Sequence, residues 1–365
     1  MGQPITRDAF GLCDPLRVRR AARAVEHSNR ALAASPPASD GSRRVQATVI
    51  DALGNGLSPS RCRGSVNIGR CIFEDTDLSG AAAGLRKYDE LLVASTWNAQ
   101  MIEAATGRTP QLIFEGVDTS LFCPGPRSGL MDTDTFHVFS GGKIEHRKGQ
   151  DLVLLAFRIF HRRHPDSVLV TAWHSPWPRL SAGFKGQLEH AIELGSDGRL
   201  DVAGWVSRNG LEAGSVVDLG FVPNALLPSV LREMDVALQP SRAEACTNLP
   251  AKEAMACGIP VIAAMNTGMK DLLTDDNCIP LRRQTDVTGA AHSHTEGWGE
   301  SDVDEIVSAL EYSYEHRDDA LAIGSRSRAW LFEHDRTWVA HAGKLKRWLL
   351  SDAIPQAPPA PVDRT

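Results

Sequence analysis

Long apolar runs are missing from this chain. No stretch approaches the roughly 20 consecutive apolar residues that a membrane span requires, and no signal peptide is recognisable. The seven cysteines are scattered and odd in number, which fits neither a disulfide framework nor a paired zinc motif. These absences predict a cytoplasmic protein in a reducing compartment.

A net positive charge is also missing, since 45 acidic residues outnumber 39 lysines and arginines. The formal net charge of −6 argues against general nucleic-acid binding. The exception is a cluster of arginines near the N-terminus, where a helix is expected over residues 15–34. The cluster is either a solvated helix face or a peripheral contact with an anionic membrane surface or an acidic acceptor. Its members are Arg17, Arg19, Arg20, Arg23, Arg30, Arg43 and Arg44.

The remaining composition is ordinary for a globular protein, with 42% hydrophobic and 23% charged residues. A length of 365 residues predicts two domains. A linker rich in proline and glycine at residues 124–129 separates them. Apolar runs predict strands at 45–50, 67–73, 88–95 and 111–114, and then at 136–140, 167–172, 216–221, 236–238, 261–264 and 278–281.

The most informative stretch is residues 235–264. A short apolar run at 236–238 predicts a buried strand, and Thr247 or Asn248 can cap the helix that follows, with Pro250 in its first turn. Gly258 is suited to the residue after the helix, before a second buried strand at 261–264. The pattern predicts a strand–loop–helix–strand unit of a parallel sheet.

Ligands bind at the carboxyl ends of parallel strands. In this unit the loop presents Glu244, and Glu253 lies about one turn into the helix. The backbone N–H groups of Thr247, Asn248 and Leu249 open that helix and suit a phosphate group. The alternative is an ordinary βαβ unit with solvated carboxylates.

A second glycine-bearing loop follows the strand at 136–140. Gly141 and Gly142 expose backbone N–H groups, and three cations follow them: Lys143, Arg147 and Lys148. Cations of this kind, close to free N–H groups, suit phosphate. The alternative is a basic surface loop.

Both loops resemble the signature of family 4 glycosyltransferases, also called group 1 glycosyltransferases. Residues 253–261 (EAMACGIPV) match the family's E-A-M-A-x-G-x-P-V, and Gly142, Lys148 and Gly149 match its G-R-x-x-x-x-K-G loop, with Lys143 where arginine is usual. Residues 115–124 resemble its N-G-V-D-x-x-x-F-x-P passage. Eight residues separate Glu244 from Glu253, where the family has seven.

The resemblance implies an α/β fold of two Rossmann-like domains (GT-B) facing across a cleft, with a short N-terminal domain. It implies an acceptor-side domain at residues 1–126 and a nucleotide-sugar-binding domain at 127–335. A terminal helix at 336–352 then braces the first domain, and residues 353–365 form a disordered, proline-rich tail.

The resemblance also implies a retaining hexosyltransferase that uses a nucleotide-diphosphate sugar as donor substrate and needs neither a cofactor nor a metal ion. Lys148 and Lys143 then hold the pyrophosphate, together with Arg147 and the backbone of Gly141 and Gly142. The N–H groups of Thr247, Asn248 and Leu249 contact phosphate, Glu253 binds the ribose hydroxyls and Glu244 orients the donor sugar. The acceptor is a carbohydrate or a lipid-linked sugar, in polysaccharide or glycoconjugate biosynthesis.

Other functions stay open. A non-catalytic nucleotide-sugar-binding module with a degenerate acceptor domain would suit the short N-terminal domain, and an epimerase or hydrolase on this architecture is a third possibility. A nicotinamide dehydrogenase is disfavoured, because no G-x-G-x-x-G follows a first strand.

Glu74, Asp75 and Asp77 are interpreted as a loop rather than a metal site, with Glu74 at a strand end facing the cleft. Residues 286–301, which include His292 and His294, are expected to be a solvated loop.

Overall fold

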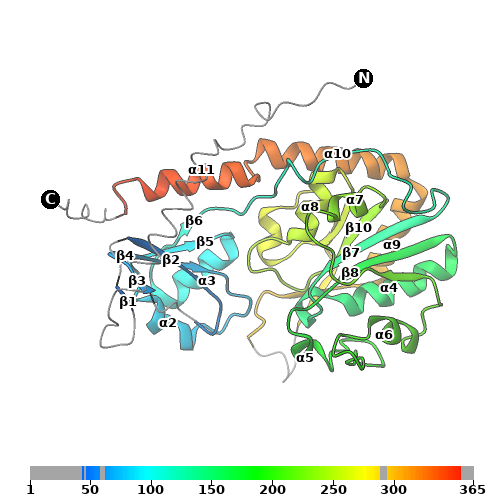
Figure 1. Cartoon of the computed structure of the whole chain (residues 1–365), viewed down its shortest axis with the longest axis horizontal. Coiled ribbons are helices and arrows are strands. Elements are labelled where there is room, and N and C mark those ends of the chain that lie inside the picture. The colour runs from blue at the N-terminus through cyan, green and yellow to red at the C-terminus, as the bar shows by residue number, and fades with distance from the viewer. Residues whose placement is uncertain (1–42, 45–46, 58–61, 288–293, 355–365) are drawn as a thin grey trace.

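Two parallel β-sheets, each flanked by helices, make up the computed structural model (Figure 1). The structure describes residues 43–44, 47–57, 62–287 and 294–354. The expected helix at 15–34 and most of the arginine cluster lie outside these residues. Arg43 and Arg44 form the two-residue strand β1 (Arg43–Arg44).

The first domain is built on a four-stranded parallel sheet with the strand order β2-β4-β5-β6. The four expected strands are all present in it. Two helices, α2 and α3, follow β4 and β5, and Ser95 caps α3 by accepting a hydrogen bond from the Asn98 N–H. The elements are β2 (Thr48–Leu53), β3 (Cys62–Arg63), β4 (Val66–Cys71), α2 (Ser79–Leu85), β5 (Glu90–Val93), α3 (Thr96–Thr106) and β6 (Gln111–Leu112).

The second domain is built on a six-stranded parallel sheet with the order β12-β11-β10-β7-β8-β9. Its central strands are buried along their whole length because helices cover both faces. The strands are β7 (Phe136–Gly142), β8 (Ser167–Trp173), β9 (Val216–Asp218), β10 (Val236–Gln239), β11 (Val261–Ala264) and β12 (Ile279–Leu281). The helices are η2 (His146–Lys148), α4 (Gln150–Arg163), α5 (Pro178–Ser181), α6 (Val202–Arg208), α7 (Leu227–Leu231), α8 (Leu249–Cys257), η3 (Thr267–Asp271), α9 (Val303–Glu315) and α10 (Arg317–Glu333).

The strand order reverses between β7 and β10. From β7 the chain moves outward through β8 to β9, and from β10 it moves the other way through β11 to β12. The two strands pair in parallel, with Val138 opposite Val236. The carboxyl ends at such a reversal leave a crevice where ligands bind. Both loops singled out in the sequence leave the sheet at this point.

The segment 286–301 differs from the loop we expected. It contains half of an antiparallel pair, in which β13 (Gln284–Asp286) bonds to β14 (Gly299–Ser301). These strands are three residues long and are held by contacts from elsewhere, since the N–H of Gly299 donates to the carbonyl of Arg242 at 2.9 Å. Local sequence carries no periodicity over so short a length. His292 lies outside the described residues.

The terminal helix α11 (Trp338–Leu349) leaves the second domain and packs on the first (Figure 1). Its Leu345, Trp348 and Leu349 lie against a buried cluster formed by β4, β5 and the segment after β6. Ile354 is buried in the same cluster, so the ordered chain runs past residue 353, where we expected the tail to begin. Residues 355–365 are outside the described part.

Direct hydrogen bonds join the two domains. Ser95 Oγ donates to the Ala245 carbonyl at 2.6 Å, and the N–H and hydroxyl of Thr96 donate to the Asp271 carboxylate at 2.7 and 2.8 Å. Lys252, on α8, is fully buried and donates to the carbonyls of Glu115 and Gly116 at 3.3 and 3.4 Å. The two domains are therefore in direct contact through hydrogen bonds between their facing loops.

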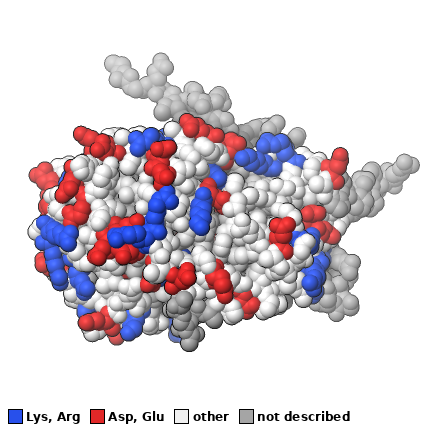
Figure 2. Space-filling view, turned by 180° about the vertical axis from the view of Figure 1, so that it is seen from behind, with Lys and Arg blue, Asp and Glu red and all other residues white. Residues whose placement is uncertain are grey.

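The surface gives no sign of a broad field of one charge on the face seen from behind. Figure 2 shows acidic and basic side chains interspersed over that face. Such mixing agrees with the small net charge. None of the described helices combines the length and apolar composition that crossing a bilayer would need.

A glycine-to-alanine pair tests the packing of α10 on α8. A Cβ at Gly324 in α10 would lie 2.2 Å from the carbonyl oxygen of Gly258, the residue that ends α8, whereas a Cβ at Gly343 in α11 would meet only the end of Arg347 at 3.5 Å. We expect Gly324→Ala to destabilise the fold by about 1–3 kcal/mol through overpacking. Gly343→Ala, the control, should stabilise it by up to about 1 kcal/mol. Urea unfolding measures both, and equal effects would contradict the packing argument.

Candidate active site

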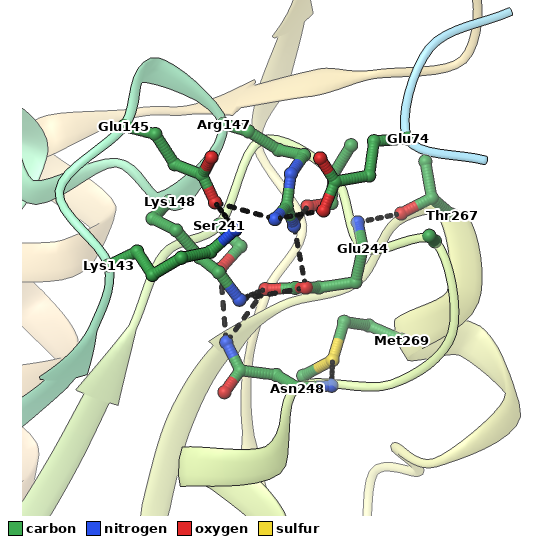
Figure 3. A network of polar contacts seen from close by, with 12 residues as sticks. Glu74, Lys143, Glu145, Arg147, Lys148, Ser241, Glu244, Asn248, Thr267 and Met269 are labelled. Atoms are coloured by element: carbon green, nitrogen blue, oxygen red, sulfur yellow. Dashed lines mark hydrogen bonds and ion pairs between the residues drawn. The ribbon is translucent and has the colours of Figure 1, made fainter. Parts of the chain in front are cut away.

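Two loops build the site at the reversal of the sheet. The first leaves β7 at Gly141 and Gly142, passes through η2 and turns at Gly149, whose φ is +71°. The second leaves β10 and ends at Asn248, where α8 begins. Figure 3 shows how side chains from both loops converge on Glu244.

Glu244 is the centre of this arrangement and is buried. Its two carboxylate oxygens lie 2.7 and 2.9 Å from Lys148 Nζ. Arg147 donates to the same carboxylate at 2.8 Å, and the side-chain amide of Asn248 donates to it at 2.9 Å. Its backbone is also fixed, because its N–H donates to Thr267 Oγ1 at 2.8 Å. The carboxylate is thus held by two cations and an amide.

Charge decides the protonation state of Glu244. Burial by itself would raise the pKa of this carboxyl group, but the nearby Lys148 and Arg147 outweigh burial and lower the pKa to about 2. Glu244 is therefore ionised at neutral pH, and it keeps both neighbouring cations paired.

Arg147 connects the two domains. Its guanidinium is buried and donates to Glu74 and Glu145 at 2.7 Å each, in addition to Glu244. Figure 3 shows Glu74 reaching from the first domain toward Arg147. Sequence reasoning placed Glu74 at the cleft but did not pair it with Arg147, since nothing in the local sequence fixes how the two domains meet.

A buried ion pair between Arg242 and Asp151 fastens the second loop to α4. Arg242 donates two hydrogen bonds to Asp151, at 2.8 and 2.7 Å, and both side chains are fully buried. The same guanidinium bonds Glu300 of β14 at 2.7 Å and the carbonyl of His146 at 2.7 Å. This pair ties the Glu244 loop to α4, to β14 and to η2. Sequence reasoning missed this role of Arg242, whose only local signal is its place two residues before Glu244.

Lys143 does not contact Glu244, and it joins the cluster only at its edge, through Glu145, which also pairs with Arg147. Its Nζ is 3.4 Å from Glu145 and 5.5 Å from the centre of the Trp177 ring, and the side chain is 38% exposed. Together with Gly141 and Gly142 it borders a cavity of about 170 Å³, whose other lining residues include His174, Phe221, Val222 and Pro250. A larger cavity of about 630 Å³ shares His174 and Phe221 with it. The two form one depression over the carboxyl ends of β7, β8 and β9.

Glu253 is half-buried on α8 and receives a hydrogen bond from Asn224 Nδ2 at 3.3 Å. Burial raises the pKa of its carboxyl group. Asn224 follows the same turn as Phe221 and Val222, which line the smaller cavity. No hydrogen bond or ion pair links Glu253 to the Glu244 cluster within the described chain, so the two carboxylates serve separate parts of the site.

The start of α8 matches the expectation in part. Asn248 caps the helix by accepting a hydrogen bond from the Ala251 N–H at 3.1 Å, and Pro250 sits in the first turn. The N–H of Asn248 itself is not available to a phosphate, because it donates to the Met269 sulfur at 3.3 Å. Leu249 is 41% exposed, and Thr247 Oγ1 is buried with no hydrogen-bond partner in the described structure.

The acidic run after β4 is organised as a loop. Asp75 receives hydrogen bonds from Asn55, and Asp77 accepts from the N–H and hydroxyl of Ser79 at the start of α2. His294 approaches Asp77 at 3.8 Å. The described residues contain no group of three or more side chains placed to hold a metal ion.

Because the pKa of Glu244 is lowered, the free energy of unfolding depends on pH. A carboxylate with a pKa below its ordinary value stabilises the fold above about pH 4.5 and loses that contribution as the pH falls toward 2. Wild type should exceed Glu244→Gln by about 3 kcal/mol in unfolding free energy near pH 6, and by less than half of that near pH 3. Urea titrations at both pH values measure the gap. Glu103→Gln, an exposed carboxylate on α3, is the charge-matched control, and a gap that does not shrink would contradict the pairing.

Comparison with known sequences finds a family match for the second domain. The sequence model of the family "Glycosyl transferases group 1" matches residues 136–293. The D-inositol 3-phosphate glycosyltransferase of Paenarthrobacter aurescens is 29% identical over 169 residues, which are 44% of this chain and 36% of that protein. The GDP-mannose-dependent alpha-(1-6)-phosphatidylinositol monomannoside mannosyltransferase of Mycolicibacterium smegmatis is 27% identical over 248 residues, 64% of this chain and 54% of that protein. The chain thus spans about half the length of these relatives or less.

Solved structures agree on the architecture. Anabaena HepE in complex with UDP and glucose superposes with a TM-score of 0.59 at 18% identity, covering 78% of this chain and 72% of that one. Sucrose-phosphate synthase from Thermosynechococcus elongatus gives 0.59 at 20% identity, covering 78% and 67%. At such identity the likeness establishes the fold, which is GT-B with two Rossmann-like domains. The family match thus covers the second domain, and the fold of the described chain is that of GT-B proteins.

Proposed function

We propose that this protein transfers a sugar from a nucleotide-diphosphate sugar to an acceptor hydroxyl with retention of anomeric configuration. The observation that carries the proposal is the pair of cations, Lys148 and Arg147, held around Glu244 at the reversal of the sheet. Fixed cations at this edge suit a diphosphate, and they are positioned before any ligand arrives.

The pyrophosphate lies between the two loops. Lys148 and Arg147 pair with its oxygens, and Lys143 closes the side toward Trp177. Gly141 and Gly142 are the last residues of β7 and pair with β8, so their N–H groups are not the free donors that the sequence suggested, and the positive end of the α8 dipole adds to the field instead. Charge grows on the phosphate as the glycosidic bond breaks, so groups fixed in advance stabilise the transition state more than the bound donor.

The nucleoside occupies the depression over β7, β8 and β9. The cavity lined by Phe221, Val222 and Pro250 offers apolar walls to a base. Glu253, with Asn224 beside it, accepts hydrogen bonds from the ribose hydroxyls. In such a donor the ribose lies on one side of the pyrophosphate and the sugar on the other. Glu253 would therefore contact the ribose, while the Glu244 cluster would contact the pyrophosphate and the sugar.

Glu244 orients the hydroxyls of the donor sugar. Because its pKa is about 2, it acts as a hydrogen-bond acceptor and not as a proton donor at neutral pH. The bond from the anomeric carbon to the phosphate oxygen breaks, the acceptor oxygen attacks from the same face, and the departing phosphate takes the acceptor proton. In this scheme the chain's own cations supply the positive charge, without a divalent ion or a cofactor.

The acceptor is proposed to be a carbohydrate or a lipid-linked sugar bound against the first domain. The names of the relatives point this way, since one acts on an inositol phosphate and another on a phosphatidylinositol mannoside. Work on a lipid-linked acceptor would place a cytoplasmic enzyme at the inner membrane face, in polysaccharide or glycoconjugate synthesis. A binding module without turnover is the second candidate, favoured by a first domain with only four strands in its main sheet among the described residues.

Calorimetric titration with UDP, GDP and ADP tests the donor site. We expect one nucleotide to bind, and Glu253→Ala to weaken it by about 10- to 100-fold, because a charged acceptor of two ribose hydroxyls is lost. Glu103→Gln should leave the affinity unchanged. Binding of none of the three nucleotides would overturn the proposal.

Turnover separates the two candidates. With the nucleotide identified, hydrolysis or transfer from its sugar conjugate should fall by about 100- to 1,000-fold in Lys148→Met, because a cation that meets developing charge is removed. Lys346→Met, an exposed lysine of α11, is the matched control. Tight nucleotide binding with no turnover by wild type on a panel of sugar and lipid-linked acceptors would support the binding module.

A further inference from the structure

Glu74 brings a first-domain carboxylate into the cation cluster. It lies in the loop after β4, and its Oε1 is 2.7 Å from the buried guanidinium of Arg147 (Figure 3). From the second domain, Trp298 donates its indole N–H to the Glu74 carbonyl at 3.2 Å. Both the side chain and the backbone of Glu74 are thus tied to the opposite domain.

The loop that carries Glu74 is held from its own side by Asn55. The side-chain oxygen of Asn55 accepts from the N–H groups of Glu74 and Asp75 at 2.8 and 3.3 Å, and its amide nitrogen donates to Asp75. Asn55 stands between the two glycines of the turn after β2. Such bracing fixes the direction in which Glu74 projects, so its contact with Arg147 is built into the loop.

The cluster is electrically balanced without a ligand. Three cations face three carboxylates, so the formal charges of +3 and −3 cancel. A bound pyrophosphate brings at least two more negative charges, and these charges compete with the carboxylates for the same donors. The cations are Lys143, Arg147 and Lys148, and the carboxylates are Glu74, Glu145 and Glu244.

Glu74 is the most exposed of the three carboxylates, at 42% against 30% for Glu145 and 5% for Glu244. Glu244 is buried and shared by Lys148, Arg147 and an amide, so removing it would strand buried charge. The Glu74 side chain is 42% exposed and already borders solvent, so water can replace Arg147 as its partner. It also belongs to the other domain, so a small separation of the domains releases it.

We propose that Glu74 is a positioning residue that sets donor affinity by occupying Arg147 until a diphosphate displaces it. This rests on the proposed donor site. In the absence of donor, the Glu74–Arg147 contact is one of several contacts between the two domains. Entry of the donor exchanges a carboxylate for a phosphate on the same guanidinium and frees Glu74 at the acceptor side of the cleft.

Glu74→Gln tests the exchange, because it keeps the shape and removes the charge. Titration with the nucleotide that binds wild type, and with inorganic pyrophosphate, should show affinity raised about five-fold or more, since the competing carboxylate is gone. Glu103→Gln changes the net charge equally in the same domain and should stay within about two-fold of wild type. A gain of affinity is not expected from structural damage, so this readout separates competition from a loss of packing.

Unchanged or weakened affinity in Glu74→Gln, with wild type binding a nucleotide normally, would overturn the role of Glu74 and leave the proposed function standing. Absence of binding by both proteins would overturn both proposals. A further readout is salt: the advantage of Glu74→Gln should shrink as sodium chloride rises from about 0.05 to 0.5 M, because screening weakens the competing pair in wild type. An advantage independent of salt would also count against the exchange.

Discussion

The ion cluster around Glu244 is the interaction on which the rest of the site depends. A buried carboxylate between a lysine and an arginine is stable only when every partner stays in place, because removal of one leaves an unpaired buried charge. Glu244 therefore fixes Lys148 and Arg147, which belong to a different loop. It does so at the one position where the strand order reverses and a crevice opens.

The surrounding fold serves this cluster by making its loops rigid. The buried pair of Arg242 and Asp151 fastens the second loop to α4, and Asn248 caps α8 while also bonding Glu244. One asparagine thus couples the start of a helix to the position of a carboxylate. Under the proposed function, a diphosphate would meet cations that the fold already holds in place, which is what electrostatic preorganisation requires.

The first domain, although small, contributes to the same cluster through Glu74. Its four-stranded sheet positions the loop after β4 that carries Glu74, and α11 packs against that sheet from the second domain. Arg147 is thus shared between the proposed chemistry and the contact between domains. If the proposed donor binds Arg147, it competes with one of the contacts between the domains, while the bonds of Ser95, Thr96 and Lys252 do not involve this guanidinium.

Local sequence patterns predicted the strands of the two main sheets, helix α8 and the two loops of the site. Apolar runs located the strands, the Asn248 cap and Gly258 bounded α8, and the glycine-lysine loop and residues 253–261 indicated the family. These features are local, set by periodicity and capping. The three-dimensional fold was needed to show that Glu244 pairs with Lys148 and Arg147, that Arg242 is buried beside Asp151, and that Glu74 reaches Arg147. Residues 73 positions apart meet there because ion pairing depends on distance in space, which no local pattern encodes.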